Sequence, residues 1–418
     1  MFDLSFHFIK KIKNNLFPFY RNKELKFVFK TMQKGFSNNV VTARFVGGCV
    51  RKYLSSDSID DIDIATILST DEIKERFKNT YFKVADTGIK HGTVTLISEK
   101  FKLELTTLRK DVETDGRHAE VEYINDWQLD SERRDFTINA IYLDINGKVF
   151  DPQMGTADLS NSNVKFIGDP QKRIEEDYLR IMRFIRFKIM YASETEDATI
   201  KAIKLNLNGI KKISKERILG ELFKILDLTN FINLNESEHL KEIFSLIFPE
   251  FENLKRLNRL KKISNSSKIN KEILLAILLI DKKSNHEYFA HKYSISNELK
   301  ENLNLLAKNL KLLQENEGFF DKDLEKNIYF NNKKLLIDLN ILNFVINTKY
   351  TFQEFLKTFK KILQSKIHVF PIDGKYLIKN GMKEGEFLGK VLKKIEQEWI
   401  SNNFKISKNR IEEIIQLY

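Results

Sequence analysis

Hydrophobic and polar residues alternate with a period of two in several short runs of the first third of the chain. The clearest case is the run 101–108, where Leu103 and Leu105 alternate with Lys102 and Glu104. Such alternation is typical of strands with one buried face. The runs that we expect to form strands are 43–46, 59–67, 81–85, 93–97, 101–108 and 140–145. Asn146-Gly147 follows the last of them and predicts a tight hairpin turn.

The period changes to about 3.6 from Lys172 onward, where Leu179, Met182 and Ile185 mark one apolar face. Amphipathic helices are predicted at 216–228, 238–247, 270–281, 297–314, 351–364 and 384–399. Nine of the 16 Gly lie between Gly35 and Gly168, among the predicted strands. The pattern therefore predicts an α+β fold, with a small mixed or antiparallel sheet in an N-terminal head and an elongated all-α remainder.

The composition indicates a class of binding partner and one segment in which binding residues are expected. The 418 residues include 70 Lys and Arg against 58 Asp and Glu, which gives a net charge of +12 and favours a polyanionic partner. Only 16 of the 70 are Arg, and nine of these fall between Arg109 and Arg217. Because guanidinium offers a planar fork of donors that ammonium lacks, this stretch is where we expect anion or base recognition.

Several classes of protein are not expected. Cys49 is the single cysteine, so we predict no disulfide partner and no cysteine-based zinc site. The longest apolar run, 273–280, is too short to cross a membrane. Charges interrupt the first residues too early for a secretory signal, and organelle targeting is not expected. We expect a cytoplasmic protein, and the sequence leaves its oligomeric state open.

The strongest local signal is a glycine turn followed by a carboxylate pair. Gly47-Gly48 ends a predicted strand, Arg51 follows, and Asp61 and Asp63 come ten residues later. Residues two apart on a strand share a face, about 6–7 Å apart at Cα, which suits shared Mg²⁺ ions in phosphoryl transfer. Glycine lets backbone N–H groups approach phosphate closely, and an arginine adds a charged fork. The alternative is an Asp-rich strand end in a solvated turn.

Glu104 is a candidate third carboxylate, because it points away from Leu103 and Leu105 on the neighbouring predicted strand. The alternative is an ordinary solvent-facing glutamate. His91 and His118 show no metal-ligand spacing, and we interpret both as structural or loop residues.

A second signal lies in the segment 176–187, which places Asp177, Arg180, Arg183 and Arg186 at steps of three on a predicted helix. Cytosine and adenine both present an amino donor beside a ring-nitrogen acceptor, whereas uracil and guanine do not. A carboxylate and a guanidinium in the positions of Asp177 and Arg180 would therefore select C and A. Arg183 and Arg186 would be free for triphosphate binding or base stacking. The alternative is a surface helix with ion pairs such as Glu176 with Arg180.

These segments resemble the polymerase-β-like nucleotidyltransferases, and more narrowly the class II CCA-adding tRNA nucleotidyltransferases and bacterial poly(A) polymerases. The segments 87–96 (TGIKHGTVTL), 106–119 (TTLRKDVETDGRHA) and 132–140 (ERRDFTINA) extend the resemblance. It implies that Asp61 and Asp63 bind catalytic Mg²⁺, and that nucleotide contacts come from Gly47, Gly48, Arg51 and Arg134. Lys52 departs from the family, which usually has Asp there.

The resemblance also implies a mobile loop at Asp115, Gly116 and Arg117 that is linked to switching between CTP and ATP. Arg134-Asp135 opens a helix-like run in this reading. The segment 213–218, which includes Arg217, matches a family segment thought to brace the preceding helix, and we assign it no contact. A faint resemblance returns at 372–400.

The resemblance predicts four regions and one activity. The regions are a nucleotidyltransferase head at 24–160, a helical neck for base recognition at 161–230, a helical body at 231–330 and a tRNA-binding helical tail at 331–418. The expected activity is template-independent, Mg²⁺-dependent addition of CMP, CMP and AMP to the 3′ end of tRNA from CTP and ATP. Poly(A) polymerase, partial CC- or A-adding activity and an inactive RNA-binding relative are the alternatives.

Overall fold

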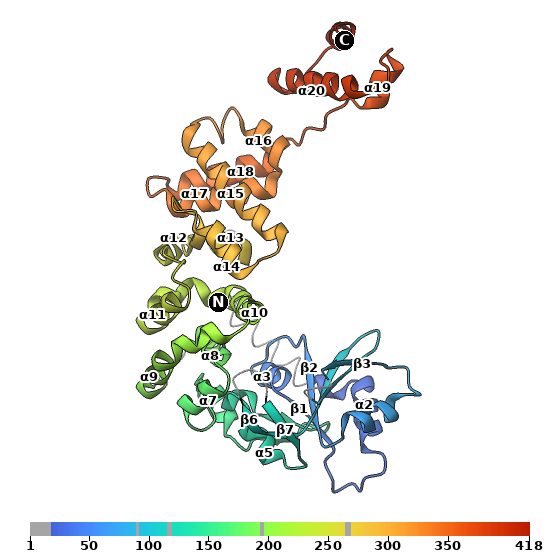
Figure 1. Ribbon diagram of the computed structural model, residues 1–418, viewed down its shortest axis with the longest axis vertical. Coiled ribbons are helices and arrows are strands. Elements are labelled where there is room, and N and C mark those ends of the chain that lie inside the picture. Colours follow the sequence, from blue (N-terminus) through green and yellow to red (C-terminus); the bar gives the residue numbers. More distant parts are fainter. Residues whose placement is uncertain (1–17, 89–91, 115–118, 193–195, 264–268) are drawn as a thin grey trace. The chain divides into compact units, whose positions relative to one another are not determined.

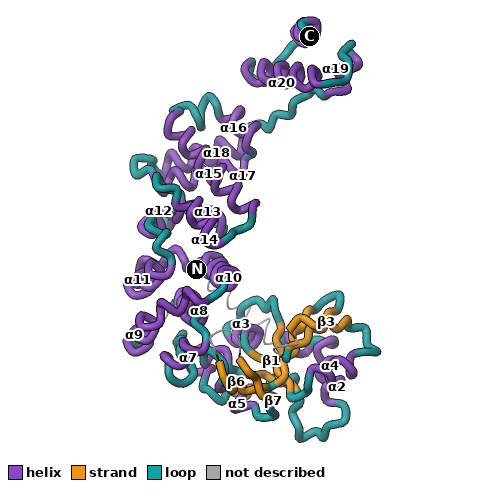
Figure 2. Tube along the Cα trace, viewed as in Figure 1, coloured by secondary structure: helices purple, strands orange, loops and turns teal. Residues whose placement is uncertain are grey.

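The two halves of the chain differ in secondary structure. The structure is a computed structural model, and it describes residues 18–88, 92–114, 119–192, 196–263 and 269–418. The chain divides into two compact units, Met1–Pro249 and Glu250–Tyr418. Among the described residues, all strands lie in the first unit (Figures 1 and 2). The predicted α+β class, with a sheet in the N-terminal head and helices after it, is confirmed.

A mixed seven-stranded sheet forms the centre of the head, in the order β3-β4-β5-β2-β1-β8-β9. Strands β2 and β5 are parallel, and the other neighbouring pairs are antiparallel. The bounds are β1 Ala43–Val46, β2 Ile62–Thr66, β3 Lys83–Gly88, β4 Thr93–Ile97, β5 Lys102–Thr107, β8 Tyr142–Leu143 and β9 Val149–Phe150.

The period-two pattern fixes which face of each strand is buried. Leu103 and Leu105 of β5 are fully buried, whereas Lys102 and Glu104 are exposed. The hairpin turn predicted at Asn146-Gly147 joins β8 to β9. A second sheet, β6 Arg109–Thr114 with β7 Ala119–Tyr123, was not predicted, because polar residues dominate β6 and β7 is short.

The helices of the first unit cover the sheet and continue beyond it. Helices α2, α3 and α4 pack on strands of the sheet, and α8 packs on α10. The helices are α2 Lys23–Gln33, α3 Gly48–Leu54, α4 Thr70–Phe77, α5 Trp127–Glu132, α6 Gly155–Ser160, α7 Pro170–Glu176, α8 Leu179–Tyr191, α9 Asp197–Asn206, α10 Lys215–Leu226 and α11 Glu238–Ile247. Short 3-10 helices lie at η1 Phe19–Arg21, η3 Thr137–Asn139, η4 Leu207–Lys212 and η5 Thr229–Glu236.

The described part of the second unit is helical. The apolar run 273–280 lies in α13 up to Leu279, and the helical residues from Ile273 to Leu279 are all buried. The three last helices share a separate apolar cluster around Leu377, Val391 and Ile411. The elements are η6 Leu254–Arg256, α12 Leu257–Leu260, α13 Lys271–Leu279, α14 Asn285–Tyr293, α15 Asn297–Glu315, α16 Leu324–Asn331, α17 Lys333–Ile346, α18 Phe352–Gln364, α19 Gly374–Lys379, α20 Glu386–Ser401 and α21 Lys408–Gln416.

The division after Pro249 falls inside the range predicted for the helical body, 231–330. Neck, body and tail boundaries therefore remain predictions. The helices predicted at 238–247 and 351–364 correspond closely to α11 and α18, because each has one continuous apolar face.

Candidate active site

Three carboxylates gather at the start of the parallel strand pair. Asp63 on β2 lies directly beside Glu104 on β5 in the strand register, and the exposed Asp61 immediately precedes β2. Burial raises the pKa of Asp63 to about 6, and the negative charge of Glu104 adds to the rise, while the positive charge of Arg134 opposes it. The sheet topology thus brings together the carboxylates that the sequence placed on two separate strands.

The glycine turn lies against this cluster. Gly47 has a φ of +71°, in the left-handed region that favours glycine, and a Cβ atom there would lie 3.8 Å from Asp63 Oδ2. Gly48 then begins α3. The backbone after β1 can therefore approach a ligand beside Asp63 without obstruction from a side chain.

A cavity of about 400 Å³ opens at Asp63. Its polar lining combines one carboxylate with three arginines, Arg109, Arg133 and Arg134. Its other lining residues are Val46, Ile64, Thr93 and Thr106. A negative cluster beside several guanidinium groups suits a ligand that carries both cations and phosphates.

The donor set at this cavity fits Mg²⁺. No group of three or more His, Cys, Asp or Glu side chains in the described ranges is arranged to hold a metal ion. Mg²⁺ commonly takes only one or two protein carboxylates and completes its shell with water and phosphate oxygens. Asp61 and Asp63 supply hard oxygen ligands, and a divalent cation would relieve the repulsion from Glu104, which adds to the effect of burial in raising the pKa of Asp63.

Arg134 lies at the cavity, although the local structure differs from the prediction. Helix α5 ends at Glu132, so Arg134-Asp135 follows a helix instead of opening one. Arg134 Nη2 donates to Asp130 Oδ2 at 3.0 Å, and Nε donates to the Tyr142 hydroxyl at 3.1 Å. Asp130 was not singled out by the sequence, although its spacing of three and four residues from Arg133 and Arg134 is a known signal of ion pairing.

A buried polar chain connects α3 to α8. Arg51 is 6% exposed and donates through Nη1 to Asn139 Oδ1. Asn139 Nδ2 donates to Asp135 Oδ1 at 2.8 Å, and Arg183 Nε donates to Asp135 Oδ2 at 2.7 Å. Burial alone would raise the pKa of Asp135, but the charge of Arg183 and the hydrogen bonds from Asn139 and Arg183 together outweigh it, and the pKa falls to about 2. These hydrogen bonds link Arg51 of α3 and Arg183 of α8 to the same two residues, Asn139 and Asp135.

The expectation that Arg183 and Arg186 are free is wrong for this structure. Arg183 is paired with Asp135, and Arg186 Nε donates to Glu221 on α10. Glu221 is 3% exposed, so Arg186 neutralises a buried charge. These partners lie 48 and 35 residues away, and no local sequence pattern could have found them.

Asp177 and Arg180 do not share one continuous helix, contrary to the prediction. Asp177 has an extended backbone between α7 and α8, and α8 begins at Leu179. Its Oδ1 accepts a hydrogen bond from the Leu179 N–H at 3.1 Å, and its Oδ2 accepts one from Arg217 Nη2 at 2.7 Å. Arg217, to which we had assigned no contact, therefore holds a predicted base-reading residue.

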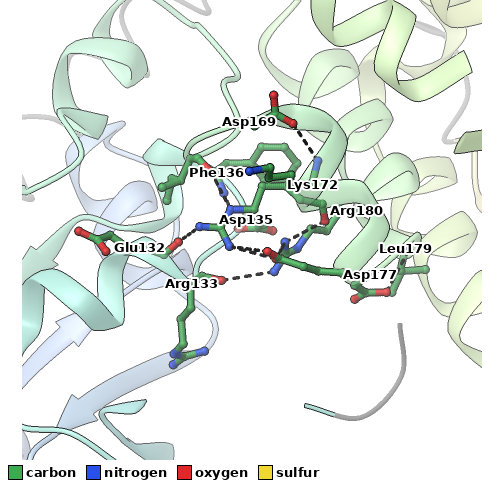
Figure 3. A network of polar contacts seen from close by, with 12 residues as sticks. Glu132, Arg133, Asp135, Phe136, Asp169, Lys172, Asp177, Leu179 and Arg180 are labelled. Carbon is green, nitrogen blue, oxygen red and sulfur yellow. Dashed lines mark hydrogen bonds and ion pairs between the residues drawn. The ribbon is translucent and has the colours of Figure 1, made fainter. Parts of the chain in front are cut away.

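Arg180 makes the ion pair with Glu176 that was the alternative interpretation. Figure 3 shows how Arg180 also reaches the carbonyl oxygen of Arg133, to which Nη2 donates at 3.3 Å. Nη1 donates to the Arg173 carbonyl at 2.9 Å. Since a guanidinium has five N–H groups, the three bonds described here leave capacity for a ligand.

The predicted loop residues Asp115, Gly116 and Arg117 lie outside the described residues, as do His91 and His118. Lys52 is ion-paired with Asp60, beside the carboxylate cluster. Within the described ranges, none of the helices has the length and apolar character needed to cross a bilayer. The cytoplasmic location remains a prediction.

Comparison with known proteins identifies the family to which this chain belongs. Residues 43–165 match the model of the poly A polymerase head domain. Over 390 residues the chain is 33% identical to the mitochondrial CCA tRNA nucleotidyltransferase 1 of Danio rerio, and the match covers 90% of this chain and 87% of that one. The chain belongs to the CCA tRNA nucleotidyltransferase family.

Solved structures agree on the fold of this family. The CCA-adding enzyme of Bacillus stearothermophilus in complex with CTP superposes with a TM-score of 0.68 at 22% identity, covering 93% of this chain and 95% of that one. The Thermotoga maritima CCA-adding enzyme in complex with tRNA gives a TM-score of 0.62 at 21% identity, covering 94% and 95%. Membership of the CCA tRNA nucleotidyltransferases makes this chain a nucleotidyltransferase.

Proposed function

We propose that this protein adds CMP, CMP and AMP to the 3′ end of tRNA, with CTP and ATP as substrates and no nucleic-acid template. The observation that carries the proposal is the glycine turn at Gly47, where an added Cβ atom would lie 3.8 Å from Asp63 Oδ2, in a chain of this family. The relatives reported above are named as a CCA tRNA nucleotidyltransferase and as CCA-adding enzymes, and the two solved complexes contain CTP in one case and tRNA in the other.

The proposed roles follow from the cavity at Asp63. Asp61 and Asp63 would hold Mg²⁺, with Glu104 beside them as the third carboxylate. Bound Mg²⁺ would polarise phosphate oxygens and stabilise the charge that develops during phosphoryl transfer. The turn Gly47-Gly48 and the guanidinium groups of Arg51 and Arg134 would bind and orient the phosphates. Arg183 and Arg186 would act through their ion pairs with Asp135 and Glu221, which fix the positions of the elements around the site.

Base selection is proposed for Asp177 and Arg180. The carboxylate of Asp177 would accept a hydrogen bond from the amino group of C or A, and Arg180 would donate to the adjacent ring nitrogen. Uracil and guanine present a carbonyl and a ring N–H in these places, so both contacts would be lost. Each Asp177 oxygen already accepts one hydrogen bond and has capacity for another.

A second candidate is a poly(A) polymerase, which the head-domain match favours. The test supplies ATP alone, and then CTP with ATP, to a tRNA that lacks its CCA end and to an unrelated RNA. CCA addition predicts that the truncated tRNA accepts AMP efficiently only when CTP is also present. Long adenylate tails on either RNA from ATP alone would establish the alternative. Absence of Mg²⁺-dependent pyrophosphate release would indicate an inactive RNA-binding relative.

A further inference from the structure

One buried carboxylate holds all three arginines that line the cavity at Asp63. Asp130 is fully buried. Its Oδ1 accepts hydrogen bonds from Arg133 Nε at 2.9 Å and from the backbone N–H of Arg109 at 3.3 Å. Its Oδ2 accepts one from Arg134 Nη2 at 3.0 Å. Oδ1 therefore orients the guanidinium group of Arg133 and fixes the start of β6, and Oδ2 orients the guanidinium group of Arg134.

Tyr142 completes the arrangement. Its hydroxyl donates to Asp130 Oδ2 at 2.7 Å and accepts from Arg134 Nε. Burial alone would raise the pKa of Asp130, but the charges of Arg134 and Arg133 and the hydrogen bonds from Tyr142 and Arg133 together outweigh it and lower the pKa to about 2. The carboxylate is thus ionised at neutral pH, as an acceptor for two arginines must be.

The charge balance of this cluster points to an anionic ligand. A single arginine would neutralise Asp130, whereas two arginines on one carboxylate give the group of Asp130, Arg133 and Arg134 one net positive charge, beside the carboxylate of Asp63. Because both guanidinium groups share one buried anchor, their positions are fixed before a ligand arrives, and little conformational entropy is lost when it binds.

We propose that Asp130 is a positioning residue that presents Arg133 and Arg134 to the phosphate groups of the incoming nucleotide. This inference rests on the proposed function and adds Asp130 and Arg133 to its site. Asp130 acts through the arginines and touches no substrate itself.

The test compares Asp130→Asn with Glu250→Gln, a matched change of a buried carboxylate in the second unit. Glu250 is 4% exposed and is paired with Lys292 at 3.1 Å. Steady-state kinetics give KM and kcat for CTP and ATP, and equilibrium binding uses inorganic tripolyphosphate in the absence of tRNA. Thermal unfolding identifies a temperature at which every variant is folded.

Asp130→Asn is expected to weaken tripolyphosphate binding and to raise both KM values by about ten- to a hundredfold, the scale of a misplaced binding group. Selection of CTP over UTP should not change, because the base is read elsewhere. Glu250→Gln should leave all these constants at their wild-type values. Tripolyphosphate binding by Asp130→Asn equal to that of the wild type would overturn the inference.

Tyr142→Phe provides the test if Asp130→Asn is not recovered in folded form. It removes one hydrogen bond from Asp130 and one from Arg134 while the charges remain, so tripolyphosphate affinity should fall by about two- to tenfold. Unchanged affinity would contradict the inference. If the wild type extends no tRNA but binds tripolyphosphate through Asp130, the proposed function fails and the positioning role stands.

Discussion

Arg217 Nη2 lies 2.7 Å from Asp177 Oδ2, in an ion pair between residues 40 positions apart. Ser214 caps α10, and its hydroxyl accepts a hydrogen bond from the backbone N–H of Arg217. The position of Arg217 is therefore set by the start of α10, and the orientation of Asp177 is set in turn by Arg217. Under the proposed function, Arg217 would therefore influence base selection through Asp177.

Arg217→Met is expected to reduce the preference for CTP over UTP by about tenfold, because a hydrogen bond to a charged group contributes about 1.5–3 kcal/mol. The measurement is the ratio of kcat/KM for the two nucleotides. Arg410→Met is the matched control, since it breaks an arginine–carboxylate pair with Glu398 in the second unit. Unchanged preference in Arg217→Met would contradict the role of this ion pair.

Asp63→Asn is expected to reduce nucleotide addition by about a thousandfold, because metal-assisted stabilisation of phosphoryl transfer contributes several kcal/mol. Asp61→Asn should act in the same direction. Initial rates at saturating Mg²⁺ and nucleotide provide the measurement. Asp60→Asn is the control, since Asp60 is an adjacent carboxylate that pairs with Lys52 outside the cavity. Equal losses in all three variants would refute the specific assignment.

Gly47→Ala tests the contact between the glycine turn and the carboxylate. The φ of +71° makes alanine cost about 1–2 kcal/mol, and its methyl group would lie beside Asp63 Oδ2. Gly35→Ala also places alanine at a positive φ, +81°, with no atom within 4 Å of the new methyl group. Both variants should lose stability, and only Gly47→Ala should lose activity. Parallel thermal unfolding and activity assays separate the two effects.

Acid should destabilise the first unit through Asp130 and Asp135. Both have a folded-state pKa near 2, below the ordinary value of 3.8. Their contribution is present above the ordinary pKa and is lost as pH falls toward 2, on the order of 2 kcal/mol for each carboxylate. Trp399→Phe leaves Trp127 as the one tryptophan, and it lies in the first unit. Urea unfolding followed by its fluorescence should show a lower midpoint at pH 3 than at pH 5, and equal midpoints would contradict this account.

The sequence predicted those parts of the fold that depend on local periodicity. The strand Thr93–Ile97 and the helix Glu238–Ile247 have the predicted bounds, because the spacing of apolar residues in each segment marks one buried face. The β6–β7 sheet was missed, since β6 is almost entirely polar and β7 is short. The break at Asp177 was also missed, because the spacing of three continues across it.

The sequence predicted which types of residue form the site better than it predicted the contacts between them. The spacing of Asp61 and Asp63, and the alternation that exposes Glu104, indicated a carboxylate cluster before any strand pairing was known. The partners of Arg183, Arg186 and Asp177 lie 48, 35 and 40 residues away, and tertiary packing alone selects them. Nothing in one sequence distinguishes a free arginine from one that is paired in this way.

The central claim is best tested by sequencing the 3′ ends of a tRNA that lacks CCA after incubation with the protein, Mg²⁺ and all four nucleoside triphosphates at equal concentration. The account predicts products that end in CCA and grow no further. Products that end in adenylate tails, or that contain U or G at the added positions, would contradict it.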